Sequence, residues 1–151
     1  MISIGKLEKA VVGKKILIDT NIIIYLTDEI QPYARIAQSL FEMIEAGNAE
    51  AVISILSIGE VMQGPIRNKR PDLAAEVRDY LFNFPNSHCQ EITQGVLAFV
   101  ANDNRIAWSS LRAMDSLIIA SGLANNVDTF ISNDSHFKKA LQKDMLLTFD
   151  E

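Results

Sequence analysis

The sequence predicts an α/β sandwich in which helices pack on a mostly parallel β-sheet. Short runs rich in β-branched residues alternate with longer segments whose apolar residues recur at helical spacing. Strands separated by helices pair in parallel through right-handed crossovers. The 151-residue length suits one compact domain, and no repeat, low-complexity stretch or long Gly/Ser/Pro linker divides the chain. We therefore expect a single domain over residues 1–151.

The composition excludes several classes of protein. An apolar fraction of 48% and a charged fraction of 22% are typical of a globular protein and exclude a disordered one. The single cysteine, Cys89, excludes a disulfide framework and a cysteine-rich zinc site. The apolar runs are far shorter than the roughly 20 residues of a membrane span, and the first residues lack the features of a secretory signal. We therefore expect a cytoplasmic protein that does not bind a membrane.

Five segments are predicted to be strands because they are short, apolar and mostly β-branched, with polar residues or turns at their ends. The first ends in an Asp-Thr-Asn triplet, and the third is the weakest because it contains polar residues. In chain order, the strands are Lys15–Asp19, Ala51–Ser54, His88–Ile92, Thr129–Ser132 and Met145–Phe149.

Six further segments keep the spacing of helices. In chain order, they are residues 32–46, 55–62, 71–82, 93–102, 111–124 and 134–141. Gly47 ends the first helix, Gly64-Pro65 ends the second, and Pro71 lies in the favoured first turn of the third. Asn125-Asn126 ends the fifth helix.

Acidic residues follow two of the predicted strands. Asp19 ends the first strand, and Asp134 follows Thr129–Ser132 after one intervening residue. Two more acids, Glu60 and Asp115, lie on predicted helices. Because the functional crevice of an open parallel sheet lies outside the carboxyl ends of its strands, the four side chains are candidates for one site.

Each acid also has a structural interpretation. Asp19 and Asp134 could cap the helices that follow them. Ser57 and Glu60 have the spacing of a capping box, and Asp115 could cap its helix or pair with Arg112.

The apolar surroundings of Glu60 and Asp115 favour a functional interpretation. Carboxylates are costly to bury in such helices unless a partner compensates them. Four clustered carboxylates also repel one another, which raises some of their pKa values unless a cation is bound. Mg²⁺ or Mn²⁺ relieves both penalties, because these ions prefer oxygen ligands.

Four motifs in this order resemble those of PIN-domain nucleases. They are Asp19-Thr-Asn21, Ser57-Ile-Gly-Glu60-Val61, Met114-Asp-Ser-Leu-Ile-Ile-Ala120 and Ser132-Asn-Asp-Ser-His-Phe137. The resemblance covers about residues 15–149 and is nearest to the VapC-like toxins of toxin–antitoxin pairs. It implies a three-layer α/β/α sandwich with a mostly parallel sheet.

The resemblance also implies roles for individual residues. Four acids would bind the metal ion and carry the catalysis: Asp19, Glu60, Asp115 and Asp134. Four polar residues would orient the ligands or a water molecule: Thr20, Asn21, Ser132 and Asn133. It further implies an RNA substrate, a homodimer and an antitoxin partner that holds the protein inactive.

The residues themselves favour metal-assisted hydrolysis of a phosphodiester. The glycines form no phosphate-binding loop, and there is no nucleophile-elbow motif. His136 could contact the substrate, although a solvated or capping role is favoured. Two alternatives remain: a catalytically silent subunit with the same fold, or a receiver-like Mg²⁺-binding signalling domain. A receiver-like domain needs an acidic pair at the first strand end, whereas Asp19 is followed by Thr20.

An overall charge of −5 requires local basic groups to bind RNA. The candidates are five residues near the predicted acidic motifs: Arg67, Lys69, Arg70, Arg112 and Lys138. Solvated surface clusters are the simpler interpretation for such charges. Four aromatic residues are candidates for a dimer surface, with packing in the core as the alternative: Tyr33, Phe41, Tyr80 and Phe82.

Overall fold

A computed structural model describes residues 1–150 and contains a five-stranded sheet in which every pair of neighbours is parallel. The strands are β1 (Lys15–Ile18), β2 (Glu50–Ser54), β3 (Ser87–Gln90), β4 (Thr129–Ile131) and β5 (Leu146–Leu147). Their order across the sheet is β3-β2-β1-β4-β5. All five predicted strands are therefore present. Every strand except the second is shorter than expected, and the last is the most shortened.

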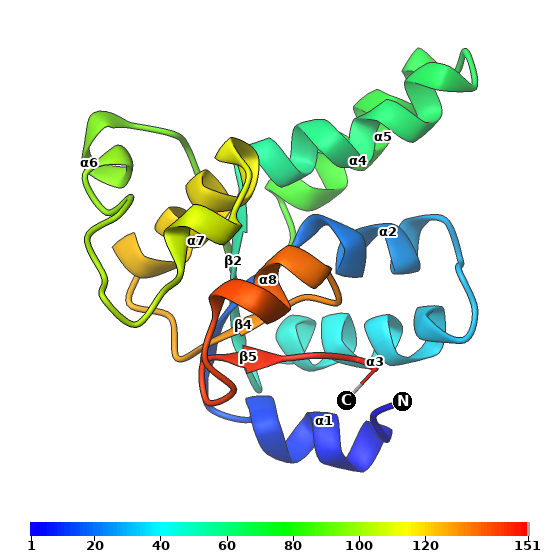
Figure 1. Cartoon of the computed structure of the whole chain (residues 1–151). Coiled ribbons are helices and arrows are strands. Elements are labelled where there is room, and N and C mark those ends of the chain that lie inside the picture. The colour runs from blue at the N-terminus through cyan, green and yellow to red at the C-terminus, as the bar shows by residue number, and fades with distance from the viewer. Residues whose placement is uncertain (151) are drawn as a thin grey trace.

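Eight α-helices and one 3-10 turn accompany these strands within the described residues, and all of them except α1 lie between two strands in the chain (Figure 1). They are α1 (Ile4–Val11), α2 (Thr20–Thr27), α3 (Tyr33–Glu45), α4 (Ile55–Arg67), α5 (Pro71–Phe82), α6 (Gln94–Leu97), η1 (Trp108–Ser110), α7 (Ala113–Ala124) and α8 (Ser135–Ala140). None of these helices is both long and apolar enough to span a bilayer.

Alternate residues of the central strand β1 face two separate apolar cores. Ile16 and Ile18 belong to a core that also contains buried side chains of α1, α2 and α3. Leu17 lies in the other core, with Ile118 of α7 and Phe137 of α8. Because successive side chains of a strand point to opposite faces, this division places helices on both sides of the sheet. The predicted three-layer α/β/α sandwich is confirmed.

The strand order places a topological switch beside β1. The chain moves outward from β1 through β2 to β3, and it then returns to the other side of β1 with β4 and β5. In such sheets a crevice forms outside the carboxyl ends of the strands at the switch. The order also differs from the 2-1-3-4-5 order of flavodoxin-like receiver domains, so the receiver-like alternative is wrong.

Helix α4 continues past the predicted stop at Gly64-Pro65 and ends at Arg67. Pro65 lacks an N–H group, but the amides of Asn68 and Arg70 bond to the carbonyls of Gly64 and Pro65, so the last turn closes. Packing of α4 against α5 supports this turn.

One predicted helix is much shorter than expected, and two helices, α1 and α2, were not among the six predicted segments. The expected helix over 93–102 is only Gln94–Leu97, because Val96 is its one buried residue and no apolar face supports a longer helix. The N-terminal helix Ile4–Val11 was not expected. Ser3 caps it, and Leu7 and Val11 bury one face of it.

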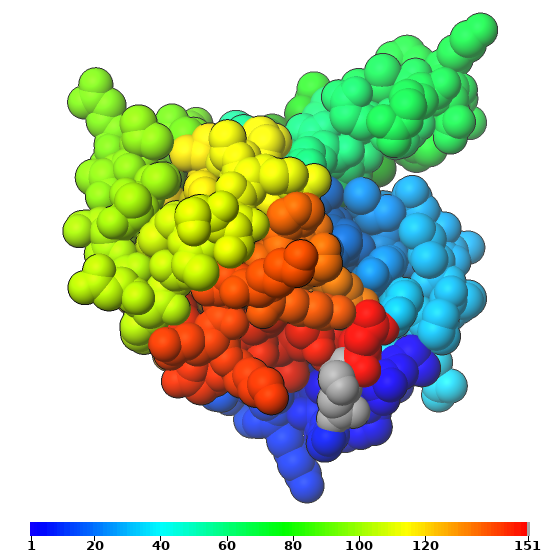
Figure 2. Space-filling model, in the orientation of Figure 1, coloured from blue at the N-terminus to red at the C-terminus, as the bar shows by residue number. Residues whose placement is uncertain are grey.

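Helices α4 and α5 form an arm that projects from the body of the molecule (Figures 1 and 2). A groove of about 790 Å³ lies beside the arm, between α5 and the pair α2–α3. Tyr80 and Phe82 on α5 are exposed, as a dimer surface would require. Phe41 is instead buried against Phe84, and Tyr33 is half-buried and stacked on Tyr25, so these two rings belong largely to the core.

Candidate active site

The four acids predicted from the sequence line one cavity at the carboxyl ends of β1 and β4. Asp19 directly follows β1 and caps α2, while Asp134 follows β4 and caps α8. Their capping roles are therefore real, and they coexist with a place in the cavity. The cavity has a volume of about 190 Å³, and its lining consists of Asp19, Thr20, Asn21, Ile24, Glu60, Arg112, Asp115 and Asp134.

Asp19 lies at the bottom of this site and is 4% exposed. Its carboxylate accepts hydrogen bonds from Ser132 Oγ at 2.6 Å and from the Thr20 amide at 2.8 Å. Burial is the main cause that raises the pKa of Asp19 to about 6; the two hydrogen bonds oppose the rise, and the nearby charges of Asp134 and Asp115 add to it. A cation in the cavity would therefore favour the ionised form.

Glu60 differs from the expectation that it is buried. Its side chain is exposed, because the apolar face of α4 is formed by Ile58 and Val61, which point into the core. The Glu60 carboxylate accepts a hydrogen bond of 2.7 Å from Thr20 Oγ1. The capping-box alternative is also wrong: Ser54 caps α4, and Ser57 Oγ is buried without a hydrogen-bond partner in the described part of the chain.

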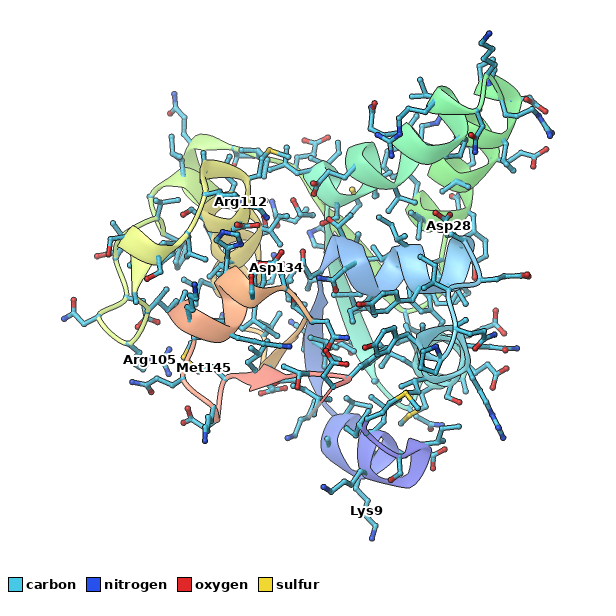
Figure 3. The ribbon with its side chains drawn as sticks, turned by 45° about the vertical axis from the view of Figure 1, so that its right-hand side comes forward. Lys9, Asp28, Arg105, Arg112, Asp134 and Met145 are labelled. Carbon is cyan, nitrogen blue, oxygen red and sulfur yellow. The ribbon has the colours of Figure 1, made fainter. Side chains whose placement is uncertain are left out.

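Asp115 is buried, as expected, and it pairs with Arg112. Arg112 donates from Nε to Asp115 Oδ2 at 2.8 Å and from Nη2 to Asp115 Oδ1 at 3.2 Å. The same Nη2 atom also reaches Asp134 Oδ2 at 3.4 Å. Figure 3 shows Arg112 and Asp134 close together across the site. The hydrogen bonds to Asp115 raise the pKa of Arg112, so a permanent positive charge lies between the two carboxylates.

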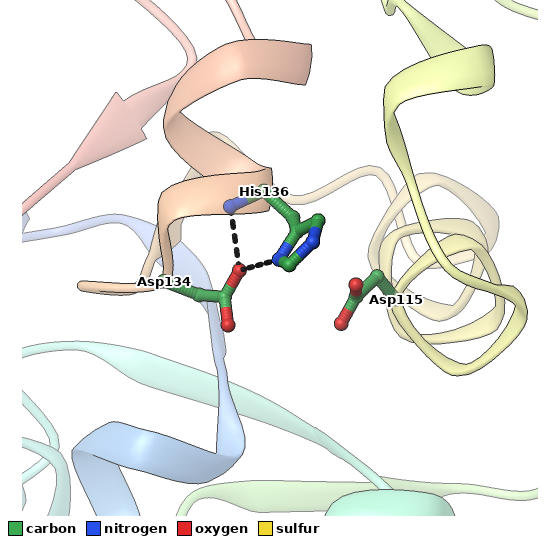
Figure 4. A group of neighbouring side chains, drawn as sticks. All are labelled: Asp115, Asp134 and His136. Atoms are coloured by element: carbon green, nitrogen blue, oxygen red, sulfur yellow. Dashed lines mark hydrogen bonds and ion pairs between the residues drawn. The ribbon is translucent and has the colours of Figure 1, made fainter.

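His136 is a functional candidate that lies outside the metal site predicted from the sequence motifs. Its Nδ1 atom lies 3.1 Å from Asp134 Oδ1, and its backbone amide donates to the same oxygen at 2.7 Å (Figure 4). Ligand atoms of Asp115, Asp134 and His136 all lie within 4.8 Å of one another. The position of His136 in the first turn after Asp134 was the available sequence signal.

The donor groups fit a hard divalent cation. Four carboxylates supply oxygen atoms, which Mg²⁺ and Mn²⁺ prefer, and the imidazole of His136 is a further donor that Mn²⁺ accepts more readily than Mg²⁺. The geometry also suits positive charge, because the Arg112 guanidinium already contacts two of the carboxylates. The chemistry of the residues present therefore fits the divalent metal ion that the sequence predicts.

The other polar candidates occupy different surroundings. Ser132 Oγ bonds to Asp19, and Asn21 Nδ2 lies 3.3 Å from both the Asp19 carboxylate and Ser132 Oγ, so both residues position Asp19. The side chain of Asn133 instead binds the C-terminal segment: its Oδ1 accepts from the amides of Phe149 and Asp150. These contacts give Asn133 a structural role, and it does not line the acidic cavity.

The basic candidates are not gathered in one place. Arg112 lines the acidic cavity, whereas Lys138 on α8 pairs with Asp150 at 3.5 Å. The remaining candidates, Arg67, Lys69 and Arg70, lie at the tip of the projecting arm, where Arg70 pairs with Asp72. Arg67 is seven residues beyond Glu60, which corresponds to about 10 Å along the helix axis.

The PIN domain family model matches residues 16–141 of the chain. The fold is also similar to solved structures, among them a toxin–antitoxin complex. A chain of VapBC2 from Rickettsia felis, crystallised with a DNA fragment from the promoter, is 17% identical and has a TM-score of 0.63, covering 90% of this chain and 99% of that one.

Two further structures have similar relationships to the chain. For a toxin–antitoxin complex from Klebsiella pneumoniae, the identity is 20% and the TM-score 0.61, with coverage of 87% of this chain and 95% of that one. For FitAcB from Neisseria gonorrhoeae, the identity is 22% and the TM-score 0.59, with coverage of 80% and 88%. No curated protein sequence matches the chain. At these identities the similarities establish a shared fold.

Proposed function

The chain belongs to the PIN domain family, and from this premise we propose that it is a divalent-metal-dependent endoribonuclease that acts in the cytoplasm. The observation that carries the proposal is the convergence of four carboxylates in one cavity at the topological switch: two follow β1 and β4, and two lie on α4 and α7. The motifs are far apart in the sequence, so a purely structural role for each acid gives no reason for this convergence.

Asp19, Glu60, Asp115 and Asp134 would hold one or two Mg²⁺ or Mn²⁺ ions. When bound, the metal supplies Lewis-acid chemistry that activates water and neutralises charge on the phosphate. Ser132 and the Thr20 amide orient the Asp19 carboxylate, and Thr20 Oγ1 orients Glu60. The backbone amide of His136 holds Asp134 in place. These fixed hydrogen bonds keep the acidic side chains in one arrangement before an RNA strand binds.

A cleavage assay with purified protein tests the proposal. The parent protein is expected to degrade a mixed pool of single-stranded RNA in Mn²⁺ or Mg²⁺, and not in EDTA. Asp19→Asn should lose this activity, whereas the matched control Asp103→Asn should keep it, because Asp103 pairs with Arg105 outside the cavity. A folded parent that cleaves no RNA in either metal would favour the silent-subunit alternative, and activity that persists in Asp19→Asn would refute the assigned site.

We also propose that the protein is the toxin of a type II toxin–antitoxin pair. The support is its similarity to a chain of a toxin–antitoxin complex from Klebsiella pneumoniae and to chains of VapBC2 and FitAcB. Induced expression in a bacterial host is then expected to arrest growth, and Asp19→Asn should relieve the arrest at equal protein level. Arrest by both proteins would contradict a mechanism that depends on the acidic cavity.

A homodimer is the assembly we propose for the isolated protein. Exposed aromatic side chains on the arm, Tyr80 and Phe82, support an apolar contact with a second copy. Light scattering at high protein concentration is expected to give twice the monomer mass of 16.8 kDa, and Phe82→Ser should weaken the association. A monomer at all concentrations would refute the dimer.

A further inference from the structure

The Arg112 guanidinium contacts two of the four carboxylates that line the acidic cavity. Among the described residues that line the cavity, it is the only basic one. Its guanidinium binds both oxygens of Asp115 and reaches Asp134 Oδ2. The other Asp134 oxygen, Oδ1, accepts from the backbone amide and lies beside the ring of His136. Every oxygen of these two carboxylates is therefore already in contact with a protein donor.

We propose that Arg112 is a built-in counter-ion that competes with the divalent metal for Asp115 and Asp134. The proposal rests on the metal site of the proposed function and adds a gate to it: these two carboxylates accept a metal ion only after the Arg112 side chain releases them. Direct competition follows because the guanidinium and a metal ion use the same oxygen atoms.

The Arg112 side chain is freer to move than the two carboxylates that it contacts. The side chain of Asp115 is 6% exposed and is attached to a helix whose inner face is packed in the core, whereas the side chain of Arg112 is 61% exposed. Arg112 precedes α7 as its N-cap residue, so its flexible stem can rotate into solvent without disturbing core packing. The His136 amide, by contrast, can leave Asp134 only if α8 unwinds. Arg112 is therefore the donor that yields.

Displacement of Arg112 has a consequence for an anionic substrate. Once the Arg112 guanidinium has left Asp115 and Asp134, it is free to bind a phosphate with two parallel hydrogen bonds. Metal binding and substrate binding would then favour each other, and this coupling is reciprocal. In the metal-free protein the same residue would stabilise the acidic cavity, and it would become a phosphate contact when the metal ion is bound.

Mn²⁺ titration of the RNA-free protein tests the competition, with isothermal calorimetry at about 0.15 M salt to screen distant charges. Arg112→Gln is expected to bind Mn²⁺ about tenfold more tightly than the parent, which corresponds to about 1.4 kcal/mol. The matched control is Arg105→Gln, because Arg105 makes a similar forked pair with Asp103 and is 59% exposed. It lies well away from Arg112 (Figure 3), and its substitution should leave the Mn²⁺ affinity unchanged.

Two more measurements keep the test decisive. Arg112→Lys retains the charge but lacks the planar fork, so an intermediate Mn²⁺ affinity is expected even if Arg112→Gln folds poorly.

In EDTA, Arg112→Gln should melt at a lower temperature than the parent, since the carboxylates lose their counter-ion. Saturating Mn²⁺ should then raise the melting temperature of Arg112→Gln by more than it raises that of the parent. A residue that only packs or caps α7 would lower the melting temperature without this larger rescue.

The outcomes separate this inference from the proposed function. Unchanged or weaker Mn²⁺ binding in Arg112→Gln and Arg112→Lys refutes the competition, as does an equal gain in Arg105→Gln, which would assign the effect to net charge. Absence of Mn²⁺ binding in both the folded parent and the folded Arg112→Gln variant refutes the metal site and this inference together. Tighter Mn²⁺ binding by Arg112→Gln, with no RNA cleavage by the parent, supports the competition and refutes only the ribonuclease.

Discussion

Replacing Asp19 with asparagine should change how the stability of the metal-free protein depends on pH. Burial raises the pKa of Asp19 from its ordinary value of 3.8 to about 6 in the folded protein. Between these two pH values the folded protein holds a proton at Asp19 and the unfolded chain does not. The free energy of unfolding therefore falls as the pH rises through this window, and the Asp19 contribution is most favourable below pH 3.8.

The size of the effect follows from the difference between the two pKa values. A difference of about 2 pH units, at about 1.4 kcal/mol for each unit, corresponds to about 3 kcal/mol. The asparagine side chain in the variant cannot ionise, so the free energy of unfolding of the variant does not fall by this amount as the pH rises. The stability of Asp19→Asn minus that of the parent should then rise by about 2–3 kcal/mol between pH 4 and pH 7.5. Hydrogen bonds lost to Ser132 and Thr20 shift this difference equally at every pH and do not change its slope.

Urea unfolding at a series of pH values in EDTA measures this difference. Asp103→Asn is the matched control, and its stability difference should change with pH in the opposite direction. The reason is that hydrogen bonds from the side chain and the backbone amide of Arg105 lower the pKa of Asp103. The stabilisation from Asp103 is present above its ordinary pKa and disappears as the pH falls through the folded-state value. The control minus the parent should therefore decrease as the pH rises.

A flat difference for Asp19→Asn, within about 0.5 kcal/mol from pH 4 to 7.5, would refute the reasoning. It would mean that Asp19 is ionised at low pH in the folded protein and that burial does not dominate its environment. Addition of Mn²⁺ at pH 7.5 provides an independent check. The metal should stabilise the parent more than Asp19→Asn, since it binds the ionised carboxylate that the variant lacks.

Three other substitutions test the packing and the connections around the site. Gly122→Ala should destabilise the protein by about 1–3 kcal/mol in thermal unfolding, because the added Cβ would lie 2.5 Å from Phe130 Cε1. Gly59 lies on a helix, and no atom lies within 4 Å of the Cβ that Gly59→Ala would add, so this substitution should instead stabilise the protein by about 0.5–1 kcal/mol. A loss of stability at both positions would contradict this packing argument. Asn133→Ala should cost about 1–3 kcal/mol and accelerate hydrogen exchange at the Phe149 amide, whose acceptor it removes; unchanged exchange would show that this bond is not formed.

The parallel sheet and the position of two acids could be predicted from the sequence because both depend on local patterns. β-Branched runs separated by helices specify parallel pairing, and polar residues directly after β1 and β4 must then lie at the same edge of the sheet. Asp19 and Asp134 are thus placed by secondary structure alone. The role of each acid in metal binding stays a prediction, as do the RNA contacts of Arg67, Lys69, Arg70 and Lys138.

Local patterns along the chain specify which acidic groups can meet, whereas the packing of the elements sets how those groups are compensated and exposed. Glu60 was expected to be buried, but the rotation of α4 against the core turns it outward toward Thr20. Asn133 shares a motif with Asp134, yet its side chain binds the amides of the C-terminal segment. Arg112 could be paired with Asp115 from spacing alone, whereas its contact with Asp134 required β4 and α7 to be brought together. Spacing determines neighbours on one helix, but contacts between elements depend on how those elements pack.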